Sequence, residues 1–311
     1  MAFSRIVADN TEKPNRGCSA RANRMASNTR DFSIKGKERM HPFDASLELE
    51  AVGSGADNTA VYRARTSDRY RNAIGPFGGW TAALLLRSVL HMPTARGAPL
   101  ALDAVFMGPI DDGELETRVF LLRQNRTVGF WRSELWQRGR ICAHAQVTLS
   151  VARSGAAMQD ARFPTVPGPD SLTEYVNPRT PVAWIQQYVF KPASGLLFSR
   201  AESMDARLWL RDVQPRPLDA VSLTAICDTP FPSPWIRLAD QIPVSTVAFS
   251  VYYRGSQDDY AQAGAGFNLL DSRAAVMENG YVDQFTHVWS ASGRLLAQTQ
   301  QMLWVASTPS T

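Results

Sequence analysis

The stretch GPFGGWTAALLLRSVLHM, residues 75–92, constrains the fold of this chain more than any other part of its 311 residues. From its tryptophan onward it is apolar around nearly the whole circumference of a helix, interrupted only by Thr81, Arg87 and Ser88. A helix without a polar face is a buried helix, and this one is too short to span a bilayer. Pro93 ends it, because proline cannot continue a helix. The stretch therefore predicts a helix enclosed by other protein elements, such as a sheet.

Two glycines, Gly78 and Gly79, stand at the front of this predicted helix. The first N–H groups of a helix have no partner within it and carry partial positive charge. Without side chains at these positions, a ligand atom can approach those N–H groups closely. Tight packing against a neighbouring element explains glycines at a helix start equally well. The pair therefore indicates either a backbone site for a negatively charged atom or a close contact of the helix.

Length and cysteine usage exclude several classes of protein. A chain of this length forms one large or two medium domains with sizeable cores. The three cysteines lie far apart and the four histidines show no metal-ligand spacing, so neither a disulfide framework nor a metal site is indicated. No apolar run reaches the length of a membrane span, and the N-terminus lacks the apolar core of a secretory signal. We therefore expect a cytoplasmic protein with no membrane span.

The formal charge of +4 comes from the start of the chain. Residues 1–40 hold nine of the 33 Lys and Arg and four of the 29 Asp and Glu, which leaves 24 bases and 25 acids for the remainder. A nucleic-acid-binding protein needs a basic face on its folded part, so no nucleic-acid partner is expected here. Residues 1–39 are also poor in large apolar side chains, which predicts a disordered basic arm.

Residues 40–152 form the first predicted folded unit. Strand-like runs follow the helix, and the last of them alternates strictly along its length. Alternation with period two over this distance is typical of a half-buried antiparallel strand. The runs lie at residues 100–107, 115–122, 127–137 and 140–151.

The second predicted unit, residues 182–307, repeats the plan of the first. Residues 153–181 between them lose all periodicity and contain five prolines, which predicts a linker. A helical segment at residues 218–227 precedes strand-like runs at residues 245–253, 267–272, 282–290 and 294–305. The last run, RLLAQTQQMLWV, aligns in pattern with RICAHAQVTLSV in the first unit. This repeat indicates duplication of one domain, and predicts an α+β fold of two antiparallel sheets, each wrapped around its own helix.

The repeat also reveals where the two units differ. Gln301 interrupts the apolar series of the last strand at the position where the first unit has Val147. A buried amide without hydrogen-bond partners costs about 1–3 kcal/mol, so Gln301 is either a satisfied core residue or part of a polar site. Asp228 follows the second helix, where its negative charge interacts unfavourably with the helix dipole. The presence of a carboxylate at this position therefore needs another explanation. Thr246 opens a strand whose alternation places it on the face opposite to Phe249.

Several segments resemble the double hot-dog acyl-CoA thioesterases similar to bacterial thioesterase II. They are FGGWTAALLLRSVL in the first unit and LTAICDTPF, STVAFSVYYR and GRLLAQTQQ in the second. The likeness spans roughly residues 40–307 at the level of short motifs. In that family an Asp, a Thr or Ser, and a Gln of the second hot-dog domain jointly hold the hydrolytic water. These residues fall on Asp228, Thr246 and Gln301 of this sequence.

The resemblance implies hydrolysis of acyl-CoA thioesters to free acid and coenzyme A, in lipid metabolism. Asp228 is then the general base for a water that Thr246 and Gln301 orient. The N–H groups of Gly78 and Gly79 are then candidates to bind the developing oxyanion. Neither a metal nor a cofactor is expected, since coenzyme A enters as part of the substrate. Pairing of hot-dog sheets in related proteins implies a homo-oligomer.

Two other functions stay open at the level of sequence. A non-catalytic acyl or acyl-CoA binding protein would keep the same pocket, although the intact Asp, Thr and Gln favour an enzyme. A hot-dog enoyl-CoA hydratase would use an acid–base pair such as Asp283 and His287, four residues apart on one predicted strand. The sequence has no GxSxG, phosphate-loop or GxGxxG motif, which argues against serine hydrolases and nucleotide-binding enzymes.

Overall fold

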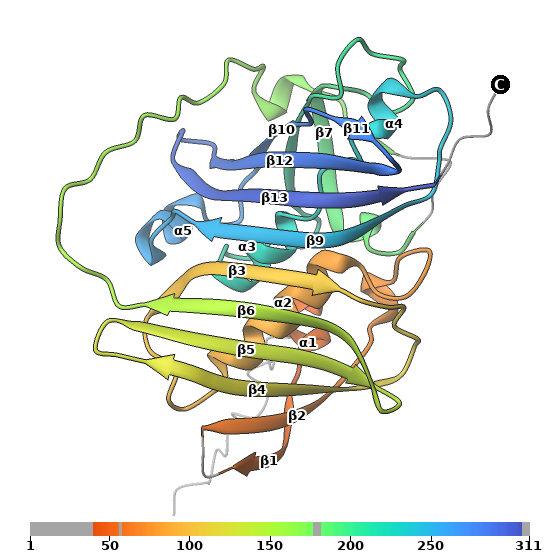
Figure 1. Cartoon of the computed structure of the whole chain (residues 1–311). Helices are drawn as coiled ribbons and strands as arrows, with labels where there is room; N and C mark the ends of the chain where they lie inside the picture. Colours follow the sequence, from red (N-terminus) through yellow and green to blue (C-terminus); the bar gives the residue numbers. More distant parts are fainter. Residues whose placement is uncertain (1–39, 56–57, 177–181, 307–311) are drawn as a thin grey trace, which may run out of the picture. The chain divides into compact units, whose positions relative to one another are not determined.

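The computed structural model describes residues 40–55, 58–176 and 182–306 (Figure 1). The predicted arm at residues 1–39 lies outside the described residues. The first half contains helices α1 (Pro42–Ser46) and α2 (Gly78–Leu90) and strands β1 (Glu50–Gly55), β2 (Thr59–Arg65), β3 (Ala98–Phe106), β4 (Glu114–Gln124), β5 (Val128–Gln137) and β6 (Arg140–Ser150). The second half contains helices α3 (Ala220–Ile226), α4 (Pro234–Arg237) and α5 (Gln257–Ala263) and strands β7 (Tyr188–Ser194), β8 (Ala206–Asp212), β9 (Val244–Tyr253), β10 (Asn268–Arg273), β11 (Met277–Glu278), β12 (Tyr281–Ser290) and β13 (Leu295–Val305).

The apolar stretch forms helix α2 as predicted, and the helix is buried on nearly all sides. Two of its polar residues bond to the backbone of the preceding turn. The Thr81 hydroxyl donates to the Phe77 carbonyl at 3.2 Å, and the Ser88 hydroxyl donates to the Leu84 carbonyl at 2.8 Å. Because these bonds stay within the helix, α2 can be enclosed without leaving these hydroxyls unpaired.

The predicted strands are present close to their predicted positions. Strands β3 to β6 cover the runs of the first unit, and β9, β10, β12 and β13 cover those of the second. Buried side chains alternate with more exposed ones along most of β13, as period two requires. The outer strands β1, β2, β7 and β8 are additions that the sequence patterns do not predict.

The prediction of two separate sheets is wrong. The strands form one antiparallel sheet in the order β1-β2-β4-β5-β6-β3-β9-β13-β12-β10-β8-β7, and β11 pairs with β12. Strands β3 and β9 join the two halves, with Leu102 opposite Val251. In a separate sheet each of these strands would be an edge with unpaired N–H and C=O groups. Pairing the two edges satisfies these groups and makes the sheet continuous.

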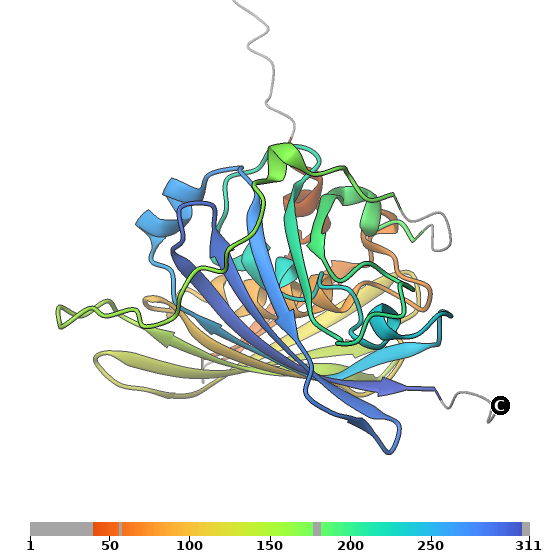
Figure 2. The same ribbon diagram turned by 90° about the horizontal axis from the view of Figure 1, so that it is seen from above.

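The two halves follow the same strand order on either side of this junction. Moving outward from it, the first half gives β3, β6, β5, β4, β2 and β1, and the second gives β9, β13, β12, β10, β8 and β7. Helices α2 and α3 contact each other on one face of the sheet, which curves around them (Figure 2). The duplication predicted from the sequence is therefore visible in the topology, with each helix covered by its own half of one sheet.

The chain crosses between the halves in a segment that packs against the second half. Residues 153–176 contain no helix or strand except a 3₁₀ turn at Pro169–Ser171. The Phe163 ring lies edge-on to Trp289 with 5.8 Å between centroids, and the Leu295 N–H donates to the Gln159 side chain at 3.1 Å. The rest of the predicted linker, residues 177–181, lies outside the described residues, and the predicted unit boundaries stay predictions.

Candidate active site

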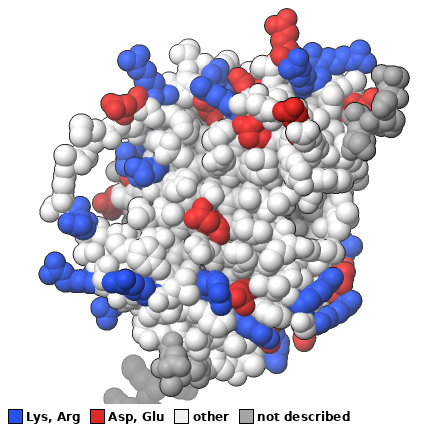
Figure 3. Space-filling model, viewed as in Figure 1, with Lys and Arg blue, Asp and Glu red and all other residues white. Residues whose placement is uncertain are grey.

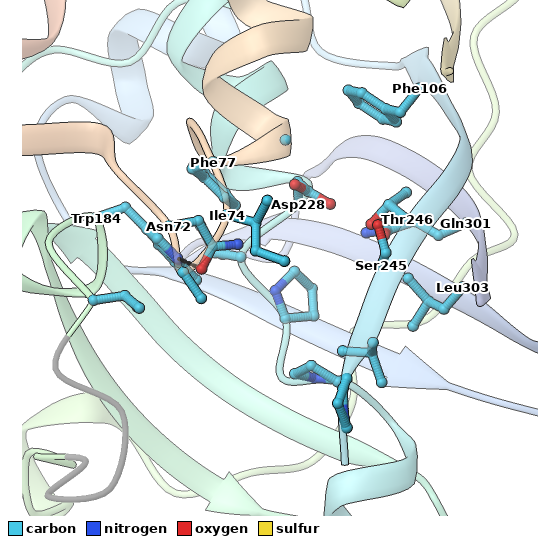
Figure 4. Close-up of a pocket in the computed structure, with 18 of the residues that line it drawn as sticks. Asn72, Ile74, Phe77, Phe106, Trp184, Asp228, Ser245, Thr246, Gln301 and Leu303 are labelled. Atoms are coloured by element: carbon cyan, nitrogen blue, oxygen red, sulfur yellow. Dashed lines mark hydrogen bonds between the residues drawn. The ribbon is translucent and has the colours of Figure 1, made fainter. Parts of the chain in front are cut away.

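A cavity of about 800 Å³ lies where the two halves meet. Its wall combines the start of α2 and the end of β3 with the segment after α3 and with parts of β9, β12 and β13. Asp228, Thr246 and Gln301 all line this cavity, together with Gly78. Figure 4 shows the first three directed toward one region of it. The structure thus brings together residues that lie far apart in the sequence.

Asp228 directly follows the short helix α3 and lies against the first turn of α2. The Gly79 N–H and the Gln301 side chain lie close enough to this carboxylate to favour its charged form. A Cβ atom placed on Gly78 would lie 2.8 Å from Asp228 Oδ2, so the carboxylate sits close to the bare start of the helix. The positive end of α2 therefore offsets the unfavourable position of this charge at the end of α3.

Burial raises the pKa of Asp228 from 3.8 to about 7. Desolvation disfavours the charged carboxylate, and it outweighs the hydrogen bonds from Gly79 and Gln301, which lower the pKa. The side chain is half-buried because it borders the cavity. A carboxyl group with a pKa near neutrality can accept and return a proton at ordinary pH. Such displaced pKa values are typical of functional sites.

Gln301 connects Asp228 to Thr246. The Thr246 hydroxyl donates to Gln301 Oε1 at 3.2 Å, and the Gln301 side chain favours the charged form of the Asp228 carboxylate. Only 4% of the Gln301 surface is exposed. At the matched position of the first half, Val147 is buried in the apolar core. The polar network of the three side chains therefore exists in one half only.

The predicted orientation of Thr246 is wrong, and a β-bulge is the reason. Strand β9 pairs regularly with β13 along most of its length, but the pairing skips Val247. Thr246 therefore stands opposite Leu303 and lines the cavity. An extra residue in one strand turns the side chains beyond it to the other face. Without the bulge, the hydroxyl would point away from Gln301.

The two glycines at the start of α2 have different surroundings. A Cβ atom on Gly79 would lie 2.6 Å from the Ala225 carbonyl oxygen, so this glycine permits the close contact of α2 with α3. Its N–H favours the charged form of the Asp228 carboxylate. Gly78 lines the cavity, and the backbone bonds of α2 begin with the N–H of Thr81. Close packing thus explains Gly79, and the oxyanion role of the pair stays a prediction.

Aromatic rings form much of the remaining cavity wall. The Phe77 ring stacks on Trp184 with 4.2 Å between centroids, and Phe190 stacks on Phe231 at 5.8 Å. The Trp184 indole N–H donates to the Asn72 side-chain oxygen at 3.3 Å (Figure 4). Apolar walls with a few polar groups are typical of small-molecule sites. The rings come from four separate segments, so no local pattern in the sequence could assemble them.

One further polar residue of the wall is absent from the predicted site. Gln284 of β12 stands directly opposite Gln301 in the pairing with β13, and it also lines the cavity. Only 2% of its surface is exposed. The signal that could have found it is the one that singled out Gln301, an amide in the inward-facing series of a strand.

The residues proposed for a hydratase do not meet in the cavity. Asp283 and His287 alternate with the inward-facing residues of β12, and neither lines the cavity. The Asp283 carboxylate accepts from the N–H of Val276 at 2.8 Å, and the His287 ring bonds to the Gln298 side chain at 3.2 Å. Asp283 therefore holds a turn, and the structure does not support this pair as the acid and base of the reaction.

The polar groups of the cavity wall are a carboxyl group, hydroxyl groups, amides and backbone. Within residues 40–55, 58–176 and 182–306, no group of three or more His, Cys, Asp or Glu side chains is arranged to hold a metal ion. None of the helices in the described part of the chain is long and apolar enough to cross a membrane.

Comparison with solved structures defines the class of fold. A protein of unknown function with a hot-dog fold from Alicyclobacillus acidocaldarius is 30% identical with a TM-score of 0.81, over 86% of this chain and 99% of that one. A Thermobifida fusca protein provisionally named a thioesterase II is 20% identical with a TM-score of 0.74, over 88% and 100%. The acyl-CoA thioesterase II TesB2 from Mycobacterium marinum is 18% identical with a TM-score of 0.67, over 86% and 99%. The chain therefore has a hot-dog fold.

Family models give the more particular assignment. Residues 66–150 match the acyl-CoA thioesterase N-terminal domain, and residues 161–305 match the acyl-CoA thioesterase C-terminal domain. Among curated protein sequences, none matches this chain at a significant level. The two domain matches cover most of the sequence, so the chain belongs to the acyl-CoA thioesterase family and is a thioester hydrolase.

Proposed function

We propose that this chain hydrolyses acyl-CoA thioesters with a water molecule held by Asp228, Thr246 and Gln301. The observation that carries the proposal is the hydrogen bond from Thr246 to Gln301 in the cavity wall, beside the Asp228 carboxyl group whose pKa Gln301 lowers. Membership of the acyl-CoA thioesterase family supports the reaction class. The products are the free acid and coenzyme A.

The directions of these hydrogen bonds define how water binds. The Thr246 O–H donates its hydrogen bond to Gln301, so the Thr246 oxygen accepts a hydrogen bond from the water. In this proposal the amide N–H groups of Gln301 face Asp228, whose pKa this side chain lowers, and the water oxygen. A water that donates to Asp228 and Thr246 and accepts from Gln301 retains one lone pair. That lone pair attacks the thioester carbonyl carbon, and fixing its direction contributes roughly several kcal/mol to catalysis.

Asp228 acts first as a base and then as an acid. As the water oxygen bonds to the carbonyl carbon, one water proton moves to Asp228, and the carbonyl π electrons move to its oxygen. When the tetrahedral intermediate collapses, the carbon–sulfur bond breaks and Asp228 returns its proton to the sulfur. A pKa of about 7 suits both steps. The Gly78 N–H stabilises the oxyanion in this proposal, while Gly79 orients the base.

The aromatic part of the cavity receives the acyl group in this proposal. Stacked rings at Phe77 and Trp184 and at Phe190 and Phe231 offer an apolar surface, which favours apolar acyl chains over charged ones. The reaction uses no cofactor besides the coenzyme A of the substrate. We place the activity in lipid metabolism in the cytoplasm, in a homo-oligomer.

The test is thiol release over a panel of acyl-CoA chain lengths. We expect Asp228→Asn and Gln301→Ala each to lower kcat by on the order of 100-fold or more. Gln300→Ala is the matched control, because its exposed side chain faces away from the cavity on the same strand. A decrease of about twofold or less for Gln301→Ala would overturn the role of this residue as a water ligand.

The same assay separates the two alternative functions. A binding protein would hold an acyl-CoA tightly and release no thiol. A hydratase would convert an enoyl-CoA to the hydroxyacyl-CoA and would also release no thiol. An absorbance assay that follows loss of the enoyl group detects this conversion. Either result with the wild-type chain would contradict the proposed hydrolysis.

A further inference from the structure

The cavity wall holds a second buried amide beside the proposed water site. Gln284 and Gln301 are direct partners across strands β12 and β13, and both side chains face the cavity. The Cβ atoms of such a pair lie about 4.5–5.5 Å apart. Asp228 lines the same cavity, so both amides border the space that the base also borders.

Ser233 fixes which end of the Gln284 amide faces the cavity. Its backbone N–H donates to Gln284 Oε1 at 3.0 Å, and its hydroxyl donates to the same oxygen at 2.7 Å. A backbone N–H can only donate, so the atom that it contacts must be the amide oxygen. The amide nitrogen therefore points away from Ser233.

The nitrogen end of Gln284 has no acceptor in the described part of the chain. Both hydrogen bonds of the Gln284 side chain go to Oε1, so neither N–H group of Nε2 has a partner within residues 40–55, 58–176 and 182–306. Only 2% of the Gln284 surface is exposed, and the side chain still borders the cavity. This placement is that of a donor reserved for a ligand.

We propose that Gln284 is a catalytic residue that donates an N–H to the carbonyl oxygen of the thioester. This role rests on the proposed hydrolysis. With its oxygen engaged, Gln284 offers donors only, which suits an atom that gains negative charge in the transition state. The water does not need it, since Gln301 takes one lone pair and the other attacks. Gln284 and the N–H of Gly78 then stabilise the oxyanion together, and Gln284 transfers no proton.

Two variants separate the donor from the shape of the side chain. Gln284→Glu keeps the length and an oxygen for Ser233 but removes the N–H groups, and Gln284→Met keeps the length alone. We expect each to lower kcat by on the order of 100-fold with a much smaller change in KM. Ser233→Ala removes one of the hydrogen bonds to Gln284 Oε1 but leaves the N–H groups of Gln284 in place. The decrease in kcat of this variant should therefore be far smaller. Gln300→Met on the exposed face is the matched control.

A vibrational measurement reports the bond directly. The probe is an acyl-CoA analogue in which CH₂ replaces the sulfur, with ¹³C at the resulting ketone. Donation from Gln284 lowers the stretching frequency of that carbonyl, so the band should move to higher frequency in Gln284→Met and stay unchanged in Gln300→Met.

The proposal is overturned if kcat of Gln284→Met and Gln284→Glu stays within about threefold of wild type, or if the band does not move. Equal losses in Ser233→Ala and Gln284→Met would also overturn it, because they would assign Gln284 a structural role only. Failure of the proposed function differs from these results: the wild-type chain would then release no thiol, whereas the ketone band could still shift.

Discussion

Asp228 is held between opposing electrostatic effects. Burial at the cavity wall raises its pKa to about 7, while the hydrogen bonds from Gly79 and Gln301 favour the charged form and limit the rise. A fully solvated aspartate would be ionised at neutral pH but would be a weaker base. The position of this residue therefore matches its basicity to the proton transfer that we propose.

The rate should depend on pH through Asp228. The base works in its deprotonated form, so kcat/KM should fall about tenfold per unit as pH decreases below 7 and should level off above it. The sign follows from the raised pKa, because the folded protein binds this proton more tightly than an exposed aspartate does. Measurement of kcat/KM for thiol release between pH 5 and 9 checks this, within the range where the fold is stable by circular dichroism. A rate that is already maximal at pH 5 would contradict the assignment of Asp228 as the base.

At the scale of single elements, the two adjacent glycines at the start of α2 have different roles, one in packing and one at the proposed site. The vacant Cβ position of Gly79 is filled by the backbone of α3, through the Ala225 carbonyl. The vacant Cβ position of Gly78 is bordered by the Asp228 carboxylate instead. One glycine therefore sets the distance between the helices, and the other leaves room for the base.

Alanine at each glycine should separate these two functions. Gly79→Ala places a Cβ atom 2.6 Å from a backbone oxygen, so we expect a loss of about 1–3 kcal/mol in the free energy of unfolding. Gly78→Ala places a Cβ atom 2.8 Å from the movable Asp228 side chain. We expect little change in stability there, since alanine favours the helix by about 1 kcal/mol, but a decrease in kcat of on the order of tenfold or more. Urea unfolding and thiol release measure the two effects, and equal behaviour of both variants would contradict this division.

At the scale of the whole described unit, the continuous sheet has an outer face without helices. Large side chains on this face of β9, β12 and β13 are 39–46% exposed, namely Tyr252, Tyr281, Phe285 and Met302. Charged side chains gather mainly toward the rim in this view, apart from an acidic group near the middle (Figure 3). Exposed apolar patches of this kind mark surfaces that bind other proteins.

We expect this face to support the homo-oligomer that the sequence resemblance implies. Light scattering after size-exclusion chromatography should give a mass of at least twice 34.4 kDa for the wild-type chain. A double change of Phe285→Glu and Met302→Glu should shift the mass to that of the monomer, because burying two carboxylates in an interface is costly. Gln300→Glu on the same face is the polar control and should leave the mass unchanged if it lies outside the contact. A monomeric wild-type chain would contradict the expectation.

Much of the fold follows from local patterns that need no knowledge of distant residues. Strand-like runs predicted eight of the strands, and the continuous apolar helix predicted its own burial. The alignment of the two halves shows Gln301 at the position of Val147, and this comparison needs no knowledge of contacts. The outer strands β1, β2, β7 and β8 escaped prediction, because their residues lack a sustained alternation of apolar and polar side chains.

The sequence by itself determined the duplication, the buried helix and the residue types of the proposed site, because these depend on periodicity and on matched positions in the repeat. The tertiary structure alone decided how they meet. Pairing of β3 with β9 made one sheet where the pattern predicted two, and the skipped Val247 turned Thr246 toward Gln301. Strand pairing and register arise from contacts between distant segments, so they set the geometry of the site without leaving a local signal.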